Sequence, residues 1–318
     1  MAIQLGRLSL VTIAAFAAIG AAQAQNLTID FNSTQNIAGD TPAFRGSFTY
    51  EGVVYGPTNS PINGVANPTT GVSAPSASSI NLETAFTGSA NSLISTDENG
   101  IKLGNAGTYK YSDGTRGSNV VYRFYYQEYS AIAGNLTKGA NHEQEERKHF
   151  VKAVVGQGST LTALQALPED SYTYNGIAFS NFPTGNFSYT VDLLTQTGAG
   201  LFTLDNILVP ASWNGGTQGS LNVSGTLDST SLIADANGIV GSAGIEGGSV
   251  TAGAQNPSDA SQVALWNIVV ANSTTTVDPK YYLNFFGTNS GTDVAREVAG
   301  TIIGLPERIG GVAIIGKR

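Results

Sequence analysis

The residues best suited to bind a ligand lie in one short stretch, GANHEQEERKHF, from Gly139 to Phe150. This stretch contains both histidines of the chain, His142 and His149, and a dense group of charged residues in a protein in which only 12% of residues are charged. Imidazole nitrogens are common ligands of metal ions. A histidine in an exposed charged loop is also ordinary surface chemistry, so the residues alone leave a binding role and a solvated surface both open.

Sulfur ligands are missing from the part of the chain that remains after export. The sequence has no cysteine, and its single methionine is Met1. Thiolate and thioether ligands of haem iron are therefore excluded, which leaves the two histidines and the tyrosines as axial candidates. There is no G-x-S-x-G, H-E-x-x-H or Walker A motif, and the turns at 97–100 and 235–238 lack the ligand spacing of a calcium loop. Nothing selects a Ser–His–Asp triad, and we expect no enzymatic activity.

The spacing of the two histidines limits how they could share one iron. In a straight helix, His142 and His149 would lie roughly 10 Å apart along the axis. Two axial nitrogens must approach iron from opposite faces, each at about 2 Å, so a straight helix cannot provide both. A folded loop could provide both, or His142 could bind alone. We favour His142 because small residues precede it, whereas His149 adjoins Phe150 and a predicted strand and is expected to be structural or a second ligand.

A haem site also needs an apolar slot and cations that bind the propionates. Tyr125, Tyr126 and Tyr129 precede the histidines in an aromatic segment and could form the wall, although strand aromatics are usually core residues. Lys138, Arg147, Lys148 and Lys152 are the nearby cations, of which Lys138 and Arg147 are the candidates for this role. Their alternative role is a solvated face paired with the neighbouring glutamates.

The N-terminus predicts export. Residues 1–24 combine a weakly basic start, the apolar run LSLVTIAAFAAIGAA and a small-residue cleavage site that ends at Ala24, which is typical of a secretory signal peptide. The apolar run is too short and wrongly flanked to be a membrane anchor. Gln25 follows the cleavage site, where a bacterial lipoprotein would need cysteine. A net charge of −8 argues against nucleic-acid binding. We therefore expect a secreted monomer without a lipid anchor.

The composition predicts an all-β fold. Glycine is abundant (39 residues), and Tyr and Phe occur 13 times each, a mixture typical of short strands with many turns. Residues 25–135 predict an N-terminal β-rich, handle-like ligand-binding domain, and residues 136–155 a junction loop followed by a strand. Within them, the aromatic segment Asn119–Ile132 is predicted to be a single strand that packs on both faces.

Residues 156–318 predict a C-terminal eight-stranded antiparallel β-barrel, whose closure would leave no exposed edge. Its eight strand-length runs are Tyr172–Phe179, Asn186–Leu194, Gly200–Val209, Ser220–Leu227, Val263–Val270, Tyr281–Gly287, Glu297–Gly304 and Gly310–Arg318. The Gly-, Ala- and Ser-rich segment Ala234–Asp259 is predicted to be a long loop. Thr160–Asp170 is predicted to be a short helix ended by Pro168.

Four segments carry a resemblance to a known family. Taken in order, they resemble the β-barrel domain of transferrin-binding protein B, which factor H-binding and Slam-dependent surface proteins share. The segments are Leu167–Phe179, Asn186–Phe202, Tyr281–Ile302 and the closing Gly310–Arg318. Val121–Ile132 resembles the segment that joins the family's handle domain to its barrel. The first 118 residues match only loosely.

The resemblance implies a function. Most family members are lipid-anchored on the outer membrane of Gram-negative bacteria, but this chain has no cysteine for an anchor and is similar to the unanchored, hemophilin-type hemophores. A hemophore binds haem (iron protoporphyrin IX) for iron acquisition. It crosses the periplasm, leaves through a Slam-type translocon, takes haem from host haem proteins and delivers it to a TonB-dependent receptor. The alternative on the same scaffold is a module that binds a host protein, either transferrin or a complement factor.

Overall fold

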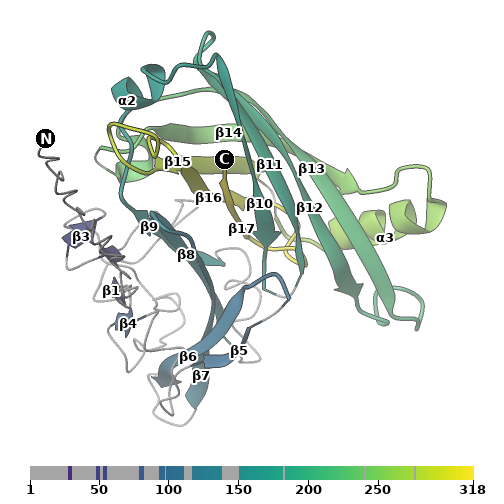
Figure 1. Ribbon diagram of the computed structural model, residues 1–318. Coiled ribbons are helices and arrows are strands. Elements are labelled where there is room, and N and C mark those ends of the chain that lie inside the picture. The colour runs from purple at the N-terminus through teal and green to yellow at the C-terminus, as the bar shows by residue number, and fades with distance from the viewer. Residues whose placement is uncertain are drawn as a thin grey trace, which may run out of the picture.

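A computed structural model gives the fold (Figure 1). It describes residues 28–30, 48–50, 53–55, 79–81, 93–96, 98–110, 117–137, 150–181, 183–239, 241–275 and 277–318. All structural statements below concern these residues.

Strands dominate the described chain and form two open sheets and one closed barrel. The four-stranded sheet has the order β3-β2-β1-β4, with β1 (Thr28–Asp30), β2 (Phe48–Tyr50), β3 (Val53–Tyr55) and β4 (Ser79–Asn81). The five-stranded sheet runs in chain order, with β5 (Leu93–Thr96), β6 (Lys102–Lys110), β7 (Gly117–Tyr126), β8 (Ser130–Thr137) and β9 (Val151–Gly156).

The barrel also runs in chain order and closes where β10 pairs with β17. Its strands are β10 (Ser171–Phe179), β11 (Thr184–Asp192), β12 (Thr197–Val209), β13 (Gly219–Ser231), β14 (Gly244–Ala254), β15 (Lys280–Phe286), β16 (Glu297–Ile303) and β17 (Val312–Lys317). Every pairing is antiparallel. The predicted all-β fold with an eight-stranded antiparallel barrel is confirmed.

Alternation along the strands fills the barrel interior. On β11, Phe187, Tyr189 and Val191 are buried, and the Tyr189 side chain has no exposed surface. On the outside, the hydroxyl groups of Thr173 and Thr190 form a hydrogen bond of 2.8 Å across β10 and β11. This period of two places the apolar side chains inside and the polar ones in solvent.

Buried tyrosine hydroxyl groups find partners within the barrel. The Tyr189 and Tyr281 hydroxyl groups lie 3.2 Å apart, and Tyr281 also donates to the carbonyl oxygen of Asp228 at 2.9 Å. Tyr174 donates to the carbonyl oxygen of Ala295 at 2.7 Å. Because the hydroxyl groups are bonded, the interior holds three tyrosines without an unsatisfied donor among them.

One predicted barrel strand is wrong. The segment Val263–Val270 lies in helix α3 (Ala260–Ala271), not in a strand. The Asp259 carboxylate caps the helix by accepting the backbone N–H of Ser261 at 2.9 Å. Leu265 and Val269, four residues apart, face the barrel and are buried. A short apolar run has no clear period, so pattern alone does not separate a buried strand from a buried helix.

The eighth strand instead comes from the segment predicted to be a loop. Within Ala234–Asp259, β14 pairs with both β13 and β15, and a short 3-10 helix (η3, Ala236–Gly238) precedes it. Glycine has a packing role here: a Cβ atom on Gly248 would lie 2.1 Å from the Tyr281 ring. At least one of the glycines that indicated a loop, Gly248, therefore makes room for an interior aromatic ring.

Two further predictions are refined. The segment Asn119–Ile132 is not one strand, because the chain turns between β7 and β8, where the Gln127 N–H donates to the Ser130 carbonyl at 2.7 Å. The predicted helix at 160–170 exists but is shorter: α2 spans Leu161–Gln165, begins at the Thr160 cap and ends before Pro168.

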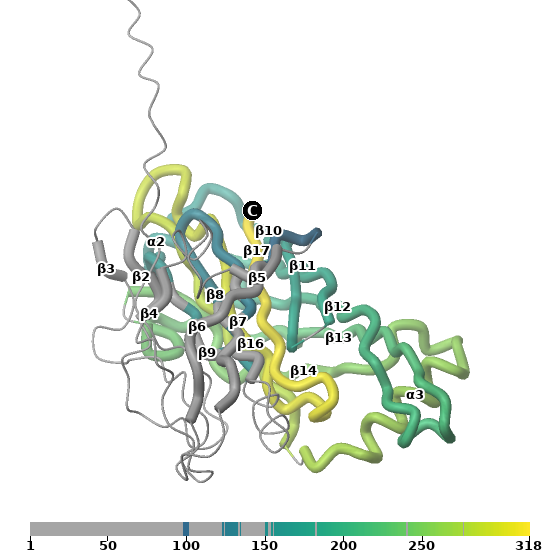
Figure 2. Tube along the Cα trace, turned by 90° about the horizontal axis from the view of Figure 1, so that it is seen from below, coloured from purple at the N-terminus to yellow at the C-terminus, as the bar shows by residue number. Residues whose placement is uncertain are grey.

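The five-stranded sheet contacts the barrel through β8 and β9, which pack against β16 and β17. Helix α3 lies with the β12–β13 hairpin at the side of the barrel away from this sheet, as both views show (Figures 1 and 2). Within the described residues, no helix combines the length and the apolar character that are needed to cross a membrane.

Candidate functional site

The predicted site residues divide into two groups. His142, His149, Lys138 and Arg147 lie outside the described residues. Tyr125, Tyr126 and Tyr129 are described, and Tyr125 and Tyr129 lie at the junction between the five-stranded sheet and the barrel.

The strands that flank the histidine segment are described. β8 ends at Thr137, β9 begins at Val151, and the two are antiparallel neighbours. Both histidines therefore belong to one connection between adjacent strands.

The last residue of that segment is fixed at the barrel. Phe150 has no exposed surface, and its ring packs edge-on against Phe179 of β10, with centroids 5.9 Å apart. The Phe150 ring also lies over Gly134 of β8, where an added Cβ would come within 2.0 Å of it. The connection that carries the histidines thus returns to the junction at its C-terminal end.

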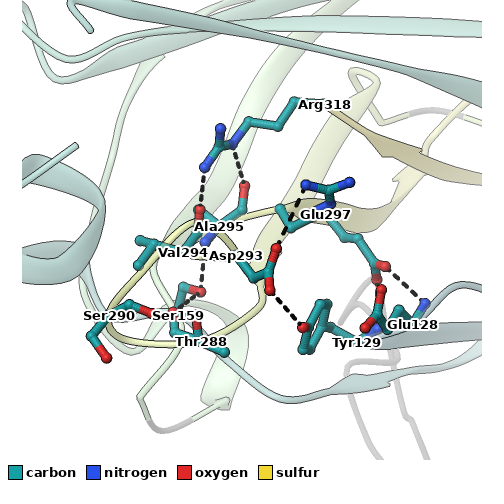
Figure 3. Close-up of polar contacts among 11 residues, drawn as sticks. Glu128, Tyr129, Ser159, Thr288, Ser290, Asp293, Val294, Ala295, Glu297 and Arg318 are labelled. Carbon is teal, nitrogen blue, oxygen red and sulfur yellow. Dashed lines mark hydrogen bonds and ion pairs between the residues drawn. The ribbon is translucent and has the colours of Figure 1, made fainter. Parts of the chain in front are cut away.

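The tyrosines have different surroundings. Tyr125 and Tyr126 are consecutive on β7, so their side chains point to opposite faces of the sheet. Tyr125 is half-buried and packs against the junction core. Tyr129 is buried there, and its hydroxyl group donates to the Asp293 carboxylate at 3.2 Å (Figure 3). Asp293 also pairs with the Arg296 guanidinium at 3.5 Å.

A buried carboxylate lies next to these tyrosines. Glu297, at the start of β16, is only 2% exposed. It accepts the backbone N–H of Glu128 at 2.8 Å, the backbone N–H of Tyr129 at 3.0 Å and the hydroxyl group of Ser130 at 2.7 Å (Figure 3). The Glu297 side chain therefore makes three bonds that attach the β7–β8 turn to the barrel.

Burial determines the protonation of this cluster. Loss of solvent raises the pKa of Glu297 to about 7, although its three hydrogen-bond donors favour the charged form. Burial and the charge of Glu297 raise the pKa of Tyr125, and burial followed by the charges of Glu128 and Asp293 raises the pKa of Tyr129. The phenolate is the form that binds iron, so these tyrosines suit the wall of a site better than its metal ligand.

A buried cation attaches β7 at a second point. Arg123 is 7% exposed, and its guanidinium donates to the carbonyl oxygens of Ser180 and Pro183 and, at 2.9 Å, to the hydroxyl group of Thr184. It also lies over the ring of Phe179, 5.3 Å from the centroid. Arg123 therefore binds the β10–β11 turn of the barrel.

The loop that carries Asp293 is held from other sides. The Ser159 hydroxyl group donates to the Thr288 carbonyl and accepts the Ala295 N–H, both at 2.8 Å. The Arg318 guanidinium donates to the carbonyl oxygens of Val294 at 2.6 Å and Ala295 at 3.1 Å (Figure 3). These bonds fix the β15–β16 loop, and with it the partner of Tyr129.

The sequence analysis gave no role to Glu297, Asp293 or Arg123. The sequence held one signal for Glu297, because this charged residue precedes the uncharged run VAGTII. In the structure every residue of β16 is buried. A charge that begins such a strand must be hydrogen-bonded if it is buried. Its partners, more than 160 residues earlier in the chain, could not be read from the sequence.

Within the described part of the chain, no three His, Cys, Asp or Glu side chains group in a way that could hold a metal ion. Comparisons with known proteins leave the chain unassigned: no protein-family model matches it, and no curated protein matches its sequence.

Proposed function

We propose that the protein is a secreted haem-binding protein that captures haem and delivers it to a TonB-dependent outer-membrane receptor. The observation that carries the proposal is the position of the only two histidines, which share one connection between neighbouring strands that pack beside the barrel. The absence of sulfur ligands after signal-peptide removal, the resemblance of the barrel segments to the transferrin-binding protein B family and the layout shared with its unanchored hemophilin-type members support it.

Each candidate residue has a distinct part in this proposal. His142 is the axial ligand of haem iron, and His149 is either structural or a second ligand. Tyr125, Tyr126 and Tyr129 form the wall, and Lys138 and Arg147 bind the propionates. A folded connection could bring both imidazoles to one iron, whereas a straight helix would keep them on one face.

The proposed route follows from the N-terminal segment and the resemblance. Residues 1–24 act as a signal peptide, and a Slam-type translocon of a Gram-negative bacterium releases the protein without a lipid anchor. A diffusible carrier must be released, whereas a trap for a host protein works best when it is tethered. The missing anchor cysteine therefore favours haem over transferrin or a complement factor as the cargo.

A hemin titration tests the proposal. The purified mature protein should give a shifted and saturable Soret band at stoichiometric hemin. The matched control is the double variant His142→Ala, His149→Ala, which should lose the band while the fold is retained. If the wild-type protein gives no saturable shift, the carrier function is wrong, and binding of host proteins becomes the experiment to do.

The single variants test the ranking of the two histidines. We expect His142→Ala to weaken hemin binding by roughly tenfold or more, which corresponds to about 1.4 kcal/mol, and to change the Soret spectrum. His149→Ala should have smaller effects on hemin binding and on the Soret spectrum. Equal spectra for the two variants would contradict the assignment of His142 as the principal ligand.

A further inference from the structure

We propose that Glu297 is a proton-sensitive latch that holds the β7–β8 turn, and with it the five-stranded sheet, against the barrel. The proposal goes beyond ligand binding and does not depend on which ligand the protein carries. It concerns only residues at the junction.

The geometry is that of a binding site for a turn. Three consecutive residues, Glu128, Tyr129 and Ser130, each direct one donor at the Glu297 carboxylate. The amide of Gln127 adds a bond of 3.1 Å to the carbonyl oxygen of Gly316 on β17. All these bonds join the sheet to the barrel, so all are lost together if the turn moves away.

The charge of Glu297 is balanced by dipoles. Among the described side chains of residues 98–101, 117–137 and 150–318, no cation lies within ion-pair distance of Glu297. The charged and titratable groups around it come from three elements. They are Tyr125, Glu128 and Tyr129 of the sheet, Asp293 and Arg296 of the β15–β16 loop, and Lys317 and Arg318 at the end of β17.

Two of the three cations bind other groups. Arg296 pairs with Asp293, and Arg318 donates to backbone carbonyls and lies over the Tyr172 ring, 4.4 Å from the centroid. Lys317 lies opposite Glu297 in the register of β16 and β17, and its side chain is exposed. Docking of the sheet thus takes this carboxylate out of water and gives it hydrogen bonds, but no ion-pair partner among the described side chains.

Proton binding is therefore coupled to docking. In the docked state burial raises the pKa of Glu297 to about 7, whereas a carboxyl group returned to solvent has an ordinary value near 4.5. Between these values the docked state binds more protons than the undocked state. Docking therefore strengthens as the pH falls through this window and weakens as it rises. Above pH 7 both states carry the charge, and the dependence ends.

The size of the pH effect on docking follows from the binding of one proton. A single group changes an equilibrium by at most about tenfold per pH unit, and the two pKa values give a docking constant about 20-fold lower at pH 7.5 than at pH 5.5. β7 and β8 also carry Tyr125, Tyr126 and the flank of the histidine segment. Release of the turn would therefore move the proposed ligand-binding strands relative to the barrel.

Hydrogen–deuterium exchange of the full chain tests the latch. Protection of peptides that contain Glu128–Ser130, corrected for intrinsic exchange rates, should fall about 20-fold from pH 5.5 to 7.5 and change little from pH 7.5 to 8.5. Peptides of β12 and β13 should show no such change. Glu297→Gln should abolish the dependence. Glu246→Gln is the matched control: this barrel carboxylate also accepts a backbone N–H, from Asn237, and should leave the dependence intact.

A second variant keeps the test decisive if Glu297→Gln does not fold. Ser130→Ala removes one donor that favours the charged form, so the midpoint of the pH profile should move upward. A role that is only structural would lower protection at every pH and leave the midpoint in place. A wild-type turn whose protection does not depend on pH, or an unchanged midpoint in Ser130→Ala, would overturn the proposal.

Discussion

The barrel interior and the junction between sheet and barrel are both buried, but different forces hold them together. The interior is filled by aliphatic and aromatic side chains such as Phe202 and Leu204, and its polar atoms are tyrosine hydroxyl groups that bond within it. The junction adds two buried charged side chains, Arg123 and Glu297, each bound by neutral dipoles of the other layer. Apolar burial depends little on direction, whereas these bonds require one docking position.

The difference indicates where the molecule can change. A closed barrel has no free edge and has its own core, so we expect it to remain folded when the sheet is disturbed. The sheet packs against the barrel through β8 and β9, and we expect its stability to rely on that contact. Both tryptophans, Trp213 and Trp266, pack against the barrel core, so their fluorescence reports on the barrel alone.

The largest expected effects come from removing one aromatic ring from each region. Phe202→Ala in the interior and Phe150→Ala at the junction should each cost about 3–5 kcal/mol, since both rings are almost fully buried. Phe202→Ala should lower the denaturation midpoint seen by tryptophan fluorescence. Phe150→Ala should leave that midpoint close to the wild-type value and increase hydrogen exchange in β7–β9. If both variants lower the tryptophan midpoint equally, the two regions unfold as one unit and the comparison fails.

Next in size is the loss of the buried cation. Arg123→Met keeps most of the side-chain volume but leaves the carbonyl oxygens of Ser180 and Pro183 without their donor, which should weaken docking by about 2–4 kcal/mol. Docking in Arg123→Lys should be weaker than in wild type and stronger than in Arg123→Met, because an ammonium group cannot reproduce the planar fork of the guanidinium. Exchange protection of β7 in the three proteins measures this, and a lysine variant as well protected as wild type would show that charge alone is sufficient.

The smallest effects are expected from removing one tyrosine hydroxyl group in each region. Tyr189→Phe removes the bond to Tyr281, and Tyr129→Phe removes the bond to Asp293; each should cost about 1 kcal/mol. The first should appear in the urea midpoint of the barrel and the second only in exchange of the β7–β8 turn. A barrel midpoint lowered by Tyr129→Phe would place that hydroxyl bond in the barrel's own stability.

The predicted number of barrel strands is correct, but two of the segment assignments behind it are wrong. The run Val263–Val270 was assigned to a strand and is α3, while β14 came from the segment assigned to a loop. The two errors cancel in the number eight. Strands with clear alternation, such as Asn186–Leu194, were located to within two residues, because a period of two is a local property.

The junction shows the same limit for the site. The aromatic character of Tyr125 and Tyr129 and their closeness to the histidine segment were visible in the sequence. Their contact with Glu297 and Asp293, and the raised pKa values that follow, depend on segments more than 160 residues apart. The positions of His142 and His149 stay predictions.

The sequence by itself determined the all-β class, most barrel strands and the absence of cysteine ligands, because alternation and composition are properties of the local chain. Only the tertiary structure decided that Val263–Val270 is helical, that a glycine-rich segment completes the barrel and that Glu297 holds the β7–β8 turn. Burial causes all three. It is set by what the rest of the chain packs against a residue, and a linear pattern does not contain it.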